Sequence, residues 1–473
     1  YPRQQLTRLW EGVLLNQFHD VLPGSCTRQV ARDAEEIYGG VEIDAGQIAR
    51  DAMAAVVQRE PGVRDFPRDP IAFFNTLGWE RTEVAALPGR GVNGLVLVTV
   101  PAFGYSVYSE ASLLASAAKS LAVILHHESD SRAVLENDLL RVSVDGAGRL
   151  TSLIHKPSGR EAVTPGQKAN QLVMFDDVPL YWDAWDVMDY HLETRKPQER
   201  TSEPLRVLTN AAGIRVAVRA CLHLGERSRA TVDISLDAGS PFVRFDVTAA
   251  WHENRRFLKT EFPVAVRSSG GEATYEIQFG HVRRPTHRNT SWDWPRYEVW
   301  AHRWAHLGEH GFGLALLNDC KYGHSARGNV LSLSLLRSPK APDPEADMGE
   351  HTFAYAAMPH QGSFQNAGVI RCASAFNHPL KAVPSGGPRV KRISQRGFFT
   401  VEPPSVVVET LKLAEGWPGH AGGHWAGAGV VLVVRLYESH GGAAVARLRC
   451  RCSPDLPLIS AVPCNMLEDA DDT

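Results

Sequence analysis

The 473-residue sequence lacks long apolar runs, an excess of either charge and a regular set of cysteines. No apolar segment approaches the roughly 20 residues that a membrane-spanning helix requires, so we expect no membrane partner. The formal net charge of −3 gives no electrostatic reason to expect nucleic acid as a partner. Seven scattered cysteines favour reduced thiols and a cytoplasmic protein over a disulfide framework.

The amino-acid composition is that of an ordinary folded protein. Hydrophobic residues make up 44% and charged residues 22% of the chain, which excludes a disordered polymer. A chain of this length exceeds a single core and should divide into about three or four units. The first residue is Tyr1, only a few residues before an amphipathic helix, so we expect a fragment of a longer protein.

The hydrophobic period changes along the chain. Residues 1–60 show helical spacing with breaks at Pro23-Gly24 and Gly39-Gly40, which predicts three helices of a small bundle. Farther along, the period falls to two, as in Val216–Leu222 and Val232–Leu236. Asp145–Gly148 and Asp237–Pro241 lie between such runs and are predicted to be hairpin turns. Many short strands at this spacing predict antiparallel β-sandwiches.

The sequence therefore predicts an α+β, multidomain chain in which a short helical bundle precedes β-sandwich domains. The expected units are a partial helical-bundle middle domain at 1–60, a linker and small β domain at 61–110, a large β-sandwich domain at 120–383 and a C-terminal β domain at 389–473.

A polar motif follows the apolar stripe of the first predicted helix. The stripe is that of a helix that faces a core, and it consists of Leu6, Leu9, Trp10, Val13, Leu14, Phe18 and Val21, which recur at three- and four-residue steps. Asn16, His19 and Asp20 fall at i, i+3 and i+4 and should share a different face of the same helix. Pro23 and Gly24 end the helix, so this pair of imidazole and carboxylate should lie at the rim of a cleft.

Two interpretations of His19 are open from the residues alone. In the first, it is an ordinary histidine that is hydrogen-bonded on the side of a helix. In the second, its neutral imidazole binds a metal ion and carboxylates from elsewhere complete the coordination shell. One histidine cannot form a metal site, and no His-Glu-x-x-His or paired Cys-x-x-Cys pattern supplies further ligands nearby.

Tryptophan and aspartate gather in two segments of the large β region, Phe175–Asp186 and Asn289–Trp294. An indole can stack on the flat face of a pyranose while carboxylates accept hydrogen bonds from sugar hydroxyls, so Trp182, Asp183 and Asp186 are candidate sugar contacts. The alternative is that the tryptophans close the end of a sandwich core and the aspartates occupy turns.

Several strings of the sequence resemble the retaining α-mannosidases of glycoside hydrolase family 38, most closely the cytosolic animal branch. These strings are Asn16–Ser25, Asp176–His191, Tyr275–His281, Trp300–Trp304, Gly311–Asp319 and Leu436–Glu438. They occur in the order expected for the family and extend over most of the chain.

The resemblance implies an N-terminal α/β barrel, a helical bundle and β-sandwich domains of the galactose-mutarotase-like supersandwich type around one divalent metal ion, zinc or cobalt. By this resemblance, His19 is a metal ligand and Asp20 contacts the sugar. The nucleophile and the acid/base carboxylate of such enzymes belong to the barrel, which is missing here, so no catalytic residue is assigned. The expected substrate is terminal α-linked mannose of free, N-glycan-derived oligosaccharides.

Two hypotheses of function follow. In the first, the chain is the C-terminal part of a metal-dependent α-mannosidase and has no useful turnover by itself. The alternative is a non-catalytic carbohydrate-binding β-sandwich protein in which His19 is structural. A reading frame that starts at Tyr1 would favour the alternative. The sequence does not predict an oligomeric state.

Overall fold

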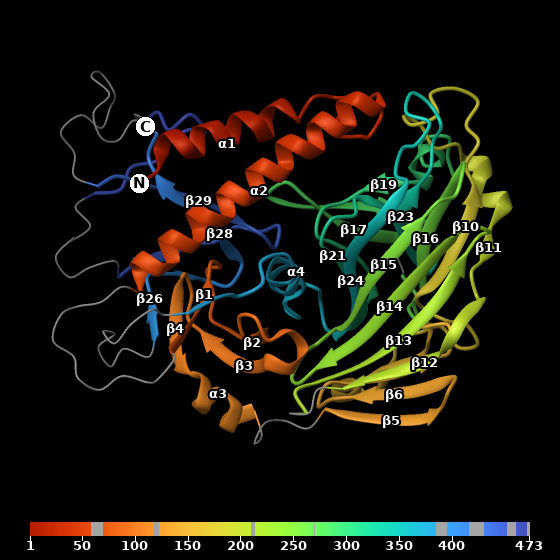
Figure 1. Cartoon of the computed structure of the whole chain (residues 1–473), viewed down its shortest axis with the longest axis horizontal. Helices are drawn as coiled ribbons and strands as arrows, with labels where there is room; N and C mark the ends of the chain where they lie inside the picture. The colour runs from red at the N-terminus through yellow and green to blue at the C-terminus, as the bar shows by residue number, and fades with distance from the viewer. Residues whose placement is uncertain are drawn as a thin grey trace.

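The computed structural model describes residues 1–57, 70–117, 123–209, 213–268, 270–384, 395–415, 430–451 and 460–470. Within these ranges the chain forms antiparallel β-sheets with few helices, as the sequence predicts (Figure 1). The sequence predicts a linker in the proline- and arginine-rich stretch Pro61–Pro70, of which residues 61–69 lie outside the described residues and Pro70 begins the first strand. No described helix is both long and apolar enough to cross a membrane.

The N-terminal region is a hairpin of two helices, α1 (Arg3–Leu15) and α2 (Arg28–Val56), drawn in red in Figure 1. The prediction of a third helix after Gly39-Gly40 is wrong, because α2 continues through both glycines. Glycine disfavours a helix by about 1 kcal/mol but does not break it, and neither glycine here has a positive φ. The two helices approach closely at Gly12, where an added Cβ would lie 3.2 Å from Ile37.

The prediction that the apolar stripe of the first helix faces a core is also wrong. No residue of α1 is buried, and the side chains of Trp10 and Phe18 are 63% and 60% exposed. The physical reason is that α1 packs against α2, and Arg3 in its first turn donates a hydrogen bond to the carbonyl of Ala414, but these contacts leave Trp10 exposed. The spacing correctly predicts a helix, but it does not reveal whether another surface covers the apolar face of that helix.

Two sheets form the large sandwich. The nine-stranded sheet contains, in spatial order, β12 (Thr201–Thr209), β13 (Arg215–Leu224), β14 (Ser228–Asp237), β15 (Val243–Trp251), β24 (Gly349–Gln361), β21 (Phe312–Asn318), β20 (Trp304–Glu309), β17 (Glu272–Ile277) and β18 (Gly280–Pro285). The six-stranded sheet contains β11 (Lys196–Pro197), β10 (Gln171–Asp176), β16 (Arg256–Pro263), β23 (Val330–Arg337), β22 (Gly323–Arg327) and β19 (Val299–Trp300).

The alternation that predicted strands in this region is confirmed. Val216–Leu222 lies in β13 and Val232–Leu236 lies in β14, and the two strands pair in register with Val218 opposite Ile234. Alternate residues of both strands point into one continuous core with the inward residues of the six-stranded sheet. This core fixes the ends of the strands, from which the loops described below project.

A five-stranded sheet packs against the same core. It contains β5 (Ile124–Ser129), β6 (Arg132–Glu136), β7 (Leu140–Asp145), β8 (Leu150–His155) and β9 (Arg160–Glu161). The turn between β7 and β8 forms where the sequence predicts it: Asp145 accepts hydrogen bonds from the backbone N–H groups of Ala147 and Arg149. Gly148 has a φ of +73°, which a side chain would disfavour.

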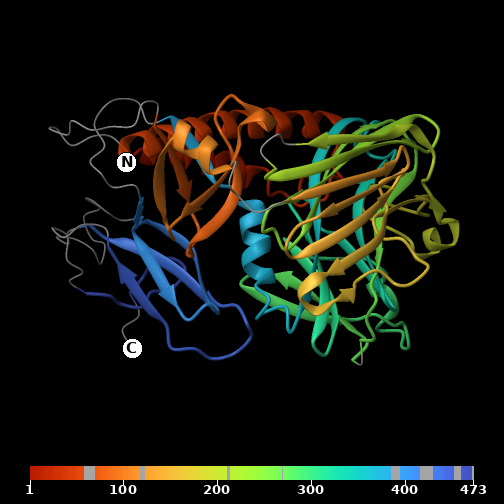
Figure 2. The same ribbon diagram turned by 90° about the horizontal axis from the view of Figure 1, so that it is seen from below.

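The remaining strands form smaller sheets beside the sandwich, with α4 (Val369–Asn377) between the two groups (Figure 2). A four-stranded sheet contains β25 (Lys381–Pro384), β1 (Pro70–Asn75), β4 (Gly104–Ser109) and β26 (Gln395–Gly397). Three two-stranded sheets of the described residues pair β2 (Arg81–Ala86) with β3 (Leu95–Val100), β27 (Phe399–Glu402) with β30 (Arg447–Cys450), and β28 (Val406–Leu413) with β29 (Leu432–Glu438). Helix α3 spans Glu110–Ala117.

The four-stranded sheet contains two strands that precede the sandwich in the sequence and two that follow it. Ile71 of β1 lies opposite Pro384 of β25, and Ser106 of β4 lies opposite Gln395 of β26. The large sandwich is therefore inserted, in topological terms, between two halves of a smaller sheet. The division into four units at the predicted boundaries stays a prediction.

Candidate carbohydrate and metal site

The His19-Asp20 motif lies in the turn between α1 and α2, not on a helix as the spacing predicted. Helix α1 ends at Leu15, and Asn16 is buried and donates a side-chain hydrogen bond to the carbonyl of Ala34 on α2. Asn16 therefore does not share a polar face with His19 and Asp20, because its amide instead holds the two helices together. The spacing rule failed because the helix ends at Leu15, whereas the apolar pattern continues to Val21.

His19 and Asp20 are presented to solvent by this turn. The His19 side chain is 71% exposed, and its Nε2 lies 3.5 Å from Oδ2 of Asp20. The other carboxylate oxygen of Asp20 accepts a hydrogen bond of 3.0 Å from the Ser25 hydroxyl. The backbone N–H of Ser25 also donates to the Asp20 carbonyl, which closes the turn. The turn thus fixes the Asp20 carboxylate while the His19 ring remains accessible.

The segment Phe175–Asp186 leads from β10 into a loop at one end of the sandwich. Trp182 is 78% exposed and has a φ of +57°. Asp183 is largely covered, and its Oδ2 accepts a hydrogen bond from the backbone N–H of Lys340. Asp186 is exposed, and its Oδ1 accepts a hydrogen bond from the N–H of Val187. Of the three candidate sugar contacts, Trp182 and Asp186 are therefore open to solvent, and Asp183 is engaged within the protein.

A half-buried arginine holds this loop in place. Arg337, at the end of β23, pairs with the buried carboxylate of Asp177 at 2.8 Å and donates hydrogen bonds to the carbonyls of Asp183 and Asp186. Burial raises the pKa of Asp177, and the charge of Arg337 opposes that rise. Three anchors on one guanidinium give the loop a fixed conformation despite its exposed aromatic side chains.

The second tryptophan-rich segment lies against the first. Helix η3 (Asp189–Thr194) supplies the carboxylate of Asp189, which accepts a hydrogen bond of 2.7 Å from the indole of Trp294 in η4 (Trp294–Tyr297). The hydroxyl of Tyr297 donates to the carbonyl of Val187. Trp292 is exposed. The structure thus brings both tryptophan-rich segments to the same end of the sandwich.

The loop 337–345, which the sequence analysis did not single out, connects this end of the sandwich to the helical hairpin. Arg28, the first residue of α2, forms an ion pair with Glu345. Burial raises the pKa of the Cys26 thiol, and the nearby carboxylates of Asp343 and Asp20 raise it further. The same loop carries Lys340, which binds Asp183. The His19 turn and the Trp182 loop are therefore neighbours of one common loop.

The described residues do not form a complete metal site. No group of three or more histidine, cysteine, aspartate or glutamate side chains in them could hold a metal ion. His19 and Asp20 together offer one imidazole and one carboxylate, whereas protein sites for zinc use three or four protein ligands. Any metal ion at His19 needs donors beyond these two.

A polar cavity of about 420 Å³ is lined by residues from four of the strings that carry the family resemblance. Glu276 and Arg303 form a bidentate ion pair there, with Glu276 buried. Tyr437 lines the same cavity, and burial raises the pKa of its phenol to about 12. These strings indicate the family but no site, because their residues meet only through the pairing of distant strands.

Comparisons with known proteins agree on the family. The Alpha mannosidase middle domain matches residues 1–56, and the Glycosyl hydrolases family 38 C-terminal domain matches residues 135–345, together more than half of the chain. The chain is 49% identical to Alpha-mannosidase 2C1 of Mus musculus over 100% of its length, and 31% identical to Alpha-mannosidase G of Dictyostelium discoideum over 99%. It covers 43% and 46% of these relatives, so it spans less than half of their length.

A solved structure of an alpha-mannosidase from Enterococcus faecalis V583 has the same fold, with a TM-score of 0.76. The likeness covers 99% of this chain and 61% of that one at 14% sequence identity, and it extends to the fold alone. The family matches and the relatives at high identity carry the assignment. The chain belongs to glycosyl hydrolase family 38, of which it comprises the middle and C-terminal domains.

Proposed function

We propose that this chain is the C-terminal part of a retaining, metal-dependent α-mannosidase that hydrolyses terminal α-linked mannose from oligosaccharides. The observation that carries the proposal is the 49% identity to Alpha-mannosidase 2C1 over the whole chain. Its substrates would be free cytosolic oligosaccharides derived from N-glycans, and the unpaired thiols of Cys26, Cys221 and Cys372 suit a cytoplasmic protein.

The proposed role of His19 is that of a metal ligand. Its imidazole is exposed and Asp20 lies next to it, so an approaching polypeptide could add the missing donors without moving the turn. Imidazole and carboxylate suit both zinc and cobalt. When bound, the ion would polarise and orient sugar hydroxyls. His19 must be neutral to bind it, so metal affinity should fall at acidic pH.

The proposed sugar contacts are Asp20, Trp182, Asp183 and Asp186. The exposed indole of Trp182 offers a face for a pyranose ring, and the carboxylates of Asp20 and Asp186 can accept hydrogen bonds from hydroxyls. Asp183 has one oxygen engaged by Lys340, so its contribution would use the other oxygen or the placement of the loop. These residues bind and orient the substrate in the proposal.

No residue of this chain is assigned to bond cleavage. Retaining hydrolysis needs two carboxyl groups about 5 Å apart, one as nucleophile and one as acid/base. In the proposal both belong to a part of the enzyme that this chain does not contain. The isolated chain should therefore not hydrolyse mannosides at a useful rate.

The test is a chimera in which the part of the Mus musculus relative that precedes the matched region is joined to residues 1–473. We expect the chimera to bind a divalent metal and to hydrolyse an aryl α-mannoside, and the 473-residue chain alone to do neither. His19→Ala should remove the metal and lower the rate at least a hundredfold. Asp20→Asn should lower the rate while the metal remains.

The matched control is His310→Ala, which changes an exposed histidine in the turn between β20 and β21. It should change neither the bound metal nor the rate of hydrolysis. Hydrolysis by the 473-residue chain alone would refute the proposal that the nucleophile and the acid/base carboxylate lie outside this chain. Retention of metal and activity in the His19→Ala chimera would make His19 structural. Mannoside binding without any turnover in the chimera would favour the carbohydrate-binding alternative.

A further inference from the structure

A cavity of about 510 Å³ lies on the six-stranded sheet, bordered by η3 and η4. Seven lysine or arginine side chains line it, against the two carboxylates of Glu199 and Glu261. The lining also includes the aromatic rings of Phe175 and Tyr297. A concave surface with this excess of cations attracts anions, because partial enclosure strengthens the electric field of the charges.

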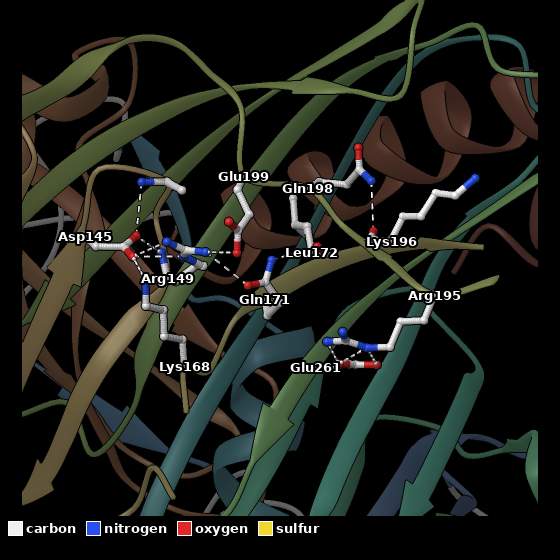
Figure 3. A network of polar contacts seen from close by, with 11 residues as sticks. Asp145, Arg149, Lys168, Gln171, Leu172, Arg195, Lys196, Gln198, Glu199 and Glu261 are labelled. Atoms are coloured by element: carbon white, nitrogen blue, oxygen red, sulfur yellow. Dashed lines mark hydrogen bonds and ion pairs between the residues drawn. The ribbon is translucent and has the colours of Figure 1, made fainter. Parts of the chain in front are cut away.

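Most of these cations are neutralised within the protein. Figure 3 shows Arg149 between Asp145 and Glu199, and Arg195 facing Glu261. The remaining paired cations are Lys168 with Asp145, Lys259 with Glu298 and Arg296 with Asp293. The paired residues therefore form a fixed, nearly neutral frame around the cavity.

Arg288 and Arg327 are different, because neither has an ion-pair or hydrogen-bond partner among the residues that the structure describes. Arg288 lies over the rings of Trp294 and Tyr297, with its Cζ 5.2 Å and 5.8 Å from their centroids. These contacts hold the guanidinium plane and leave its N–H groups free. Burial lowers the pKa of Arg288, and the charge of Arg327 lowers it further. Two like charges thus meet in one cavity, and the nearby carboxylate of Asp189 offsets them only in part.

We propose that this cavity, here called the Arg288 pocket, binds the phosphate group of a small molecule through Arg288 and Arg327. A phosphate carries close to two negative charges and several acceptor oxygens, which matches two free guanidinium groups. A carboxylate would neutralise only one of them. The pocket is distinct from the His19 turn, so this inference does not depend on the proposed mannosidase activity.

The same chemistry fits inorganic phosphate or a sugar phosphate. The volume of about 510 Å³ exceeds what a single phosphate needs and leaves room for a sugar ring. Ser325 and Lys259 lie at the floor of the cavity, where Lys259 already donates to the Ser325 hydroxyl. That hydroxyl can in turn donate its own hydrogen to a ligand.

The test is isothermal titration calorimetry of the 473-residue chain at constant ionic strength with inorganic phosphate, mannose 6-phosphate and mannose. We expect both phosphates to bind and mannose to leave this pocket empty. Arg288→Gln and Arg327→Gln should each weaken phosphate binding about tenfold, the loss expected for one charge-assisted hydrogen-bonding group. Tighter binding of mannose 6-phosphate would identify a sugar phosphate as the ligand, and equal affinity would identify free phosphate.

Arg283→Gln is the matched control, because Arg283 lies on the neighbouring strand β18, pairs with Glu272 and does not line the cavity. It should change the affinity less than twofold. Arg327 is exposed, so its substitution tests the proposal even if Arg288→Gln does not fold. Absence of phosphate binding at millimolar concentration, or an equal loss in all three variants, would overturn the proposal.

Discussion

Acidification should destabilise the large sandwich through two stacked histidines, of which His360 is buried and His306 has a buried Nε2. His306 on β20 and His360 on β24 are stacked with ring centroids 5.0 Å apart and contact the core next to Phe364. Nε2 of His306 and both ring nitrogens of His360 have no hydrogen-bond partner among the described residues. Burial lowers the pKa of His306 to about 3 and that of His360 to about 4. Both rings are therefore neutral in the folded protein.

The sign and size of the effect follow from proton uptake on unfolding. An unfolded histidine has a pKa near 6.5. At a pH between 6.5 and the pKa of the folded ring, the unfolded chain therefore carries a proton on this histidine that the folded chain lacks. The stability from each neutral ring is present above about pH 6.5 and is lost as the pH falls. The loss is about 1.4 kcal/mol per pH unit per ring, or about 4 kcal/mol for the pair at pH 5. That is a large part of an ordinary folding free energy.

Urea unfolding at pH 7.5, 6 and 5, with the proton uptake measured in the same series, checks this prediction. His306→Leu removes one titrating ring and should reduce the acid-induced loss by about 2 kcal/mol at pH 5. Phe364→Leu disturbs the same packing without removing a titrating group, so it should lower stability equally at every pH. An unchanged pH dependence in His306→Leu would refute the reasoning.

Three further predictions concern stability and can be measured by denaturant unfolding. Glu276→Gln should cost about 3–5 kcal/mol, because it removes the buried carboxylate that pairs with the half-buried guanidinium of Arg303. Asn137→Ala should cost about 2–4 kcal/mol, since that amide makes four hydrogen bonds to backbone groups in the described structure, and Asn137→Asp should recover part of the loss. Gly313→Ala should destabilise by more than about 1 kcal/mol, because the new Cβ would lie 2.4 Å from Nε2 of His306. An effect below about 0.5 kcal/mol would contradict each prediction.

The strands and their turns could be predicted because local chemistry decides them. The alternation in β13 and β14 survives in the structure, since each strand has one face in the core, and the turn after Asp145 forms where aspartate and glycine occur. The family could be predicted because whole strings of residues agree with it. These features need no knowledge of distant contacts.

The helical hairpin and the arrangement of the site could not be predicted, for physical reasons. Whether the helix face that carries Trp10 is covered depends on a surface that the spacing does not describe. Asn16 does not lie on the predicted polar face, because its side chain donates a hydrogen bond to the carbonyl of Ala34 on α2. The loop 337–345 contains no motif of its own. It matters because Arg28 ties it to α2 while Lys340 and Arg337 tie it to the Trp182 loop, and only the folded chain brings these segments together.

The insertion of the sandwich into the four-stranded sheet also has a consequence for the order of folding. β1 and β4 cannot complete their sheet until β25 and β26 have been synthesised, about 300 residues later. A loop of that length closes slowly when it is unfolded, but a sandwich that has already folded holds its two ends near each other and shortens the search. We therefore expect the sandwich to fold first and to act as the template on which the smaller sheet assembles.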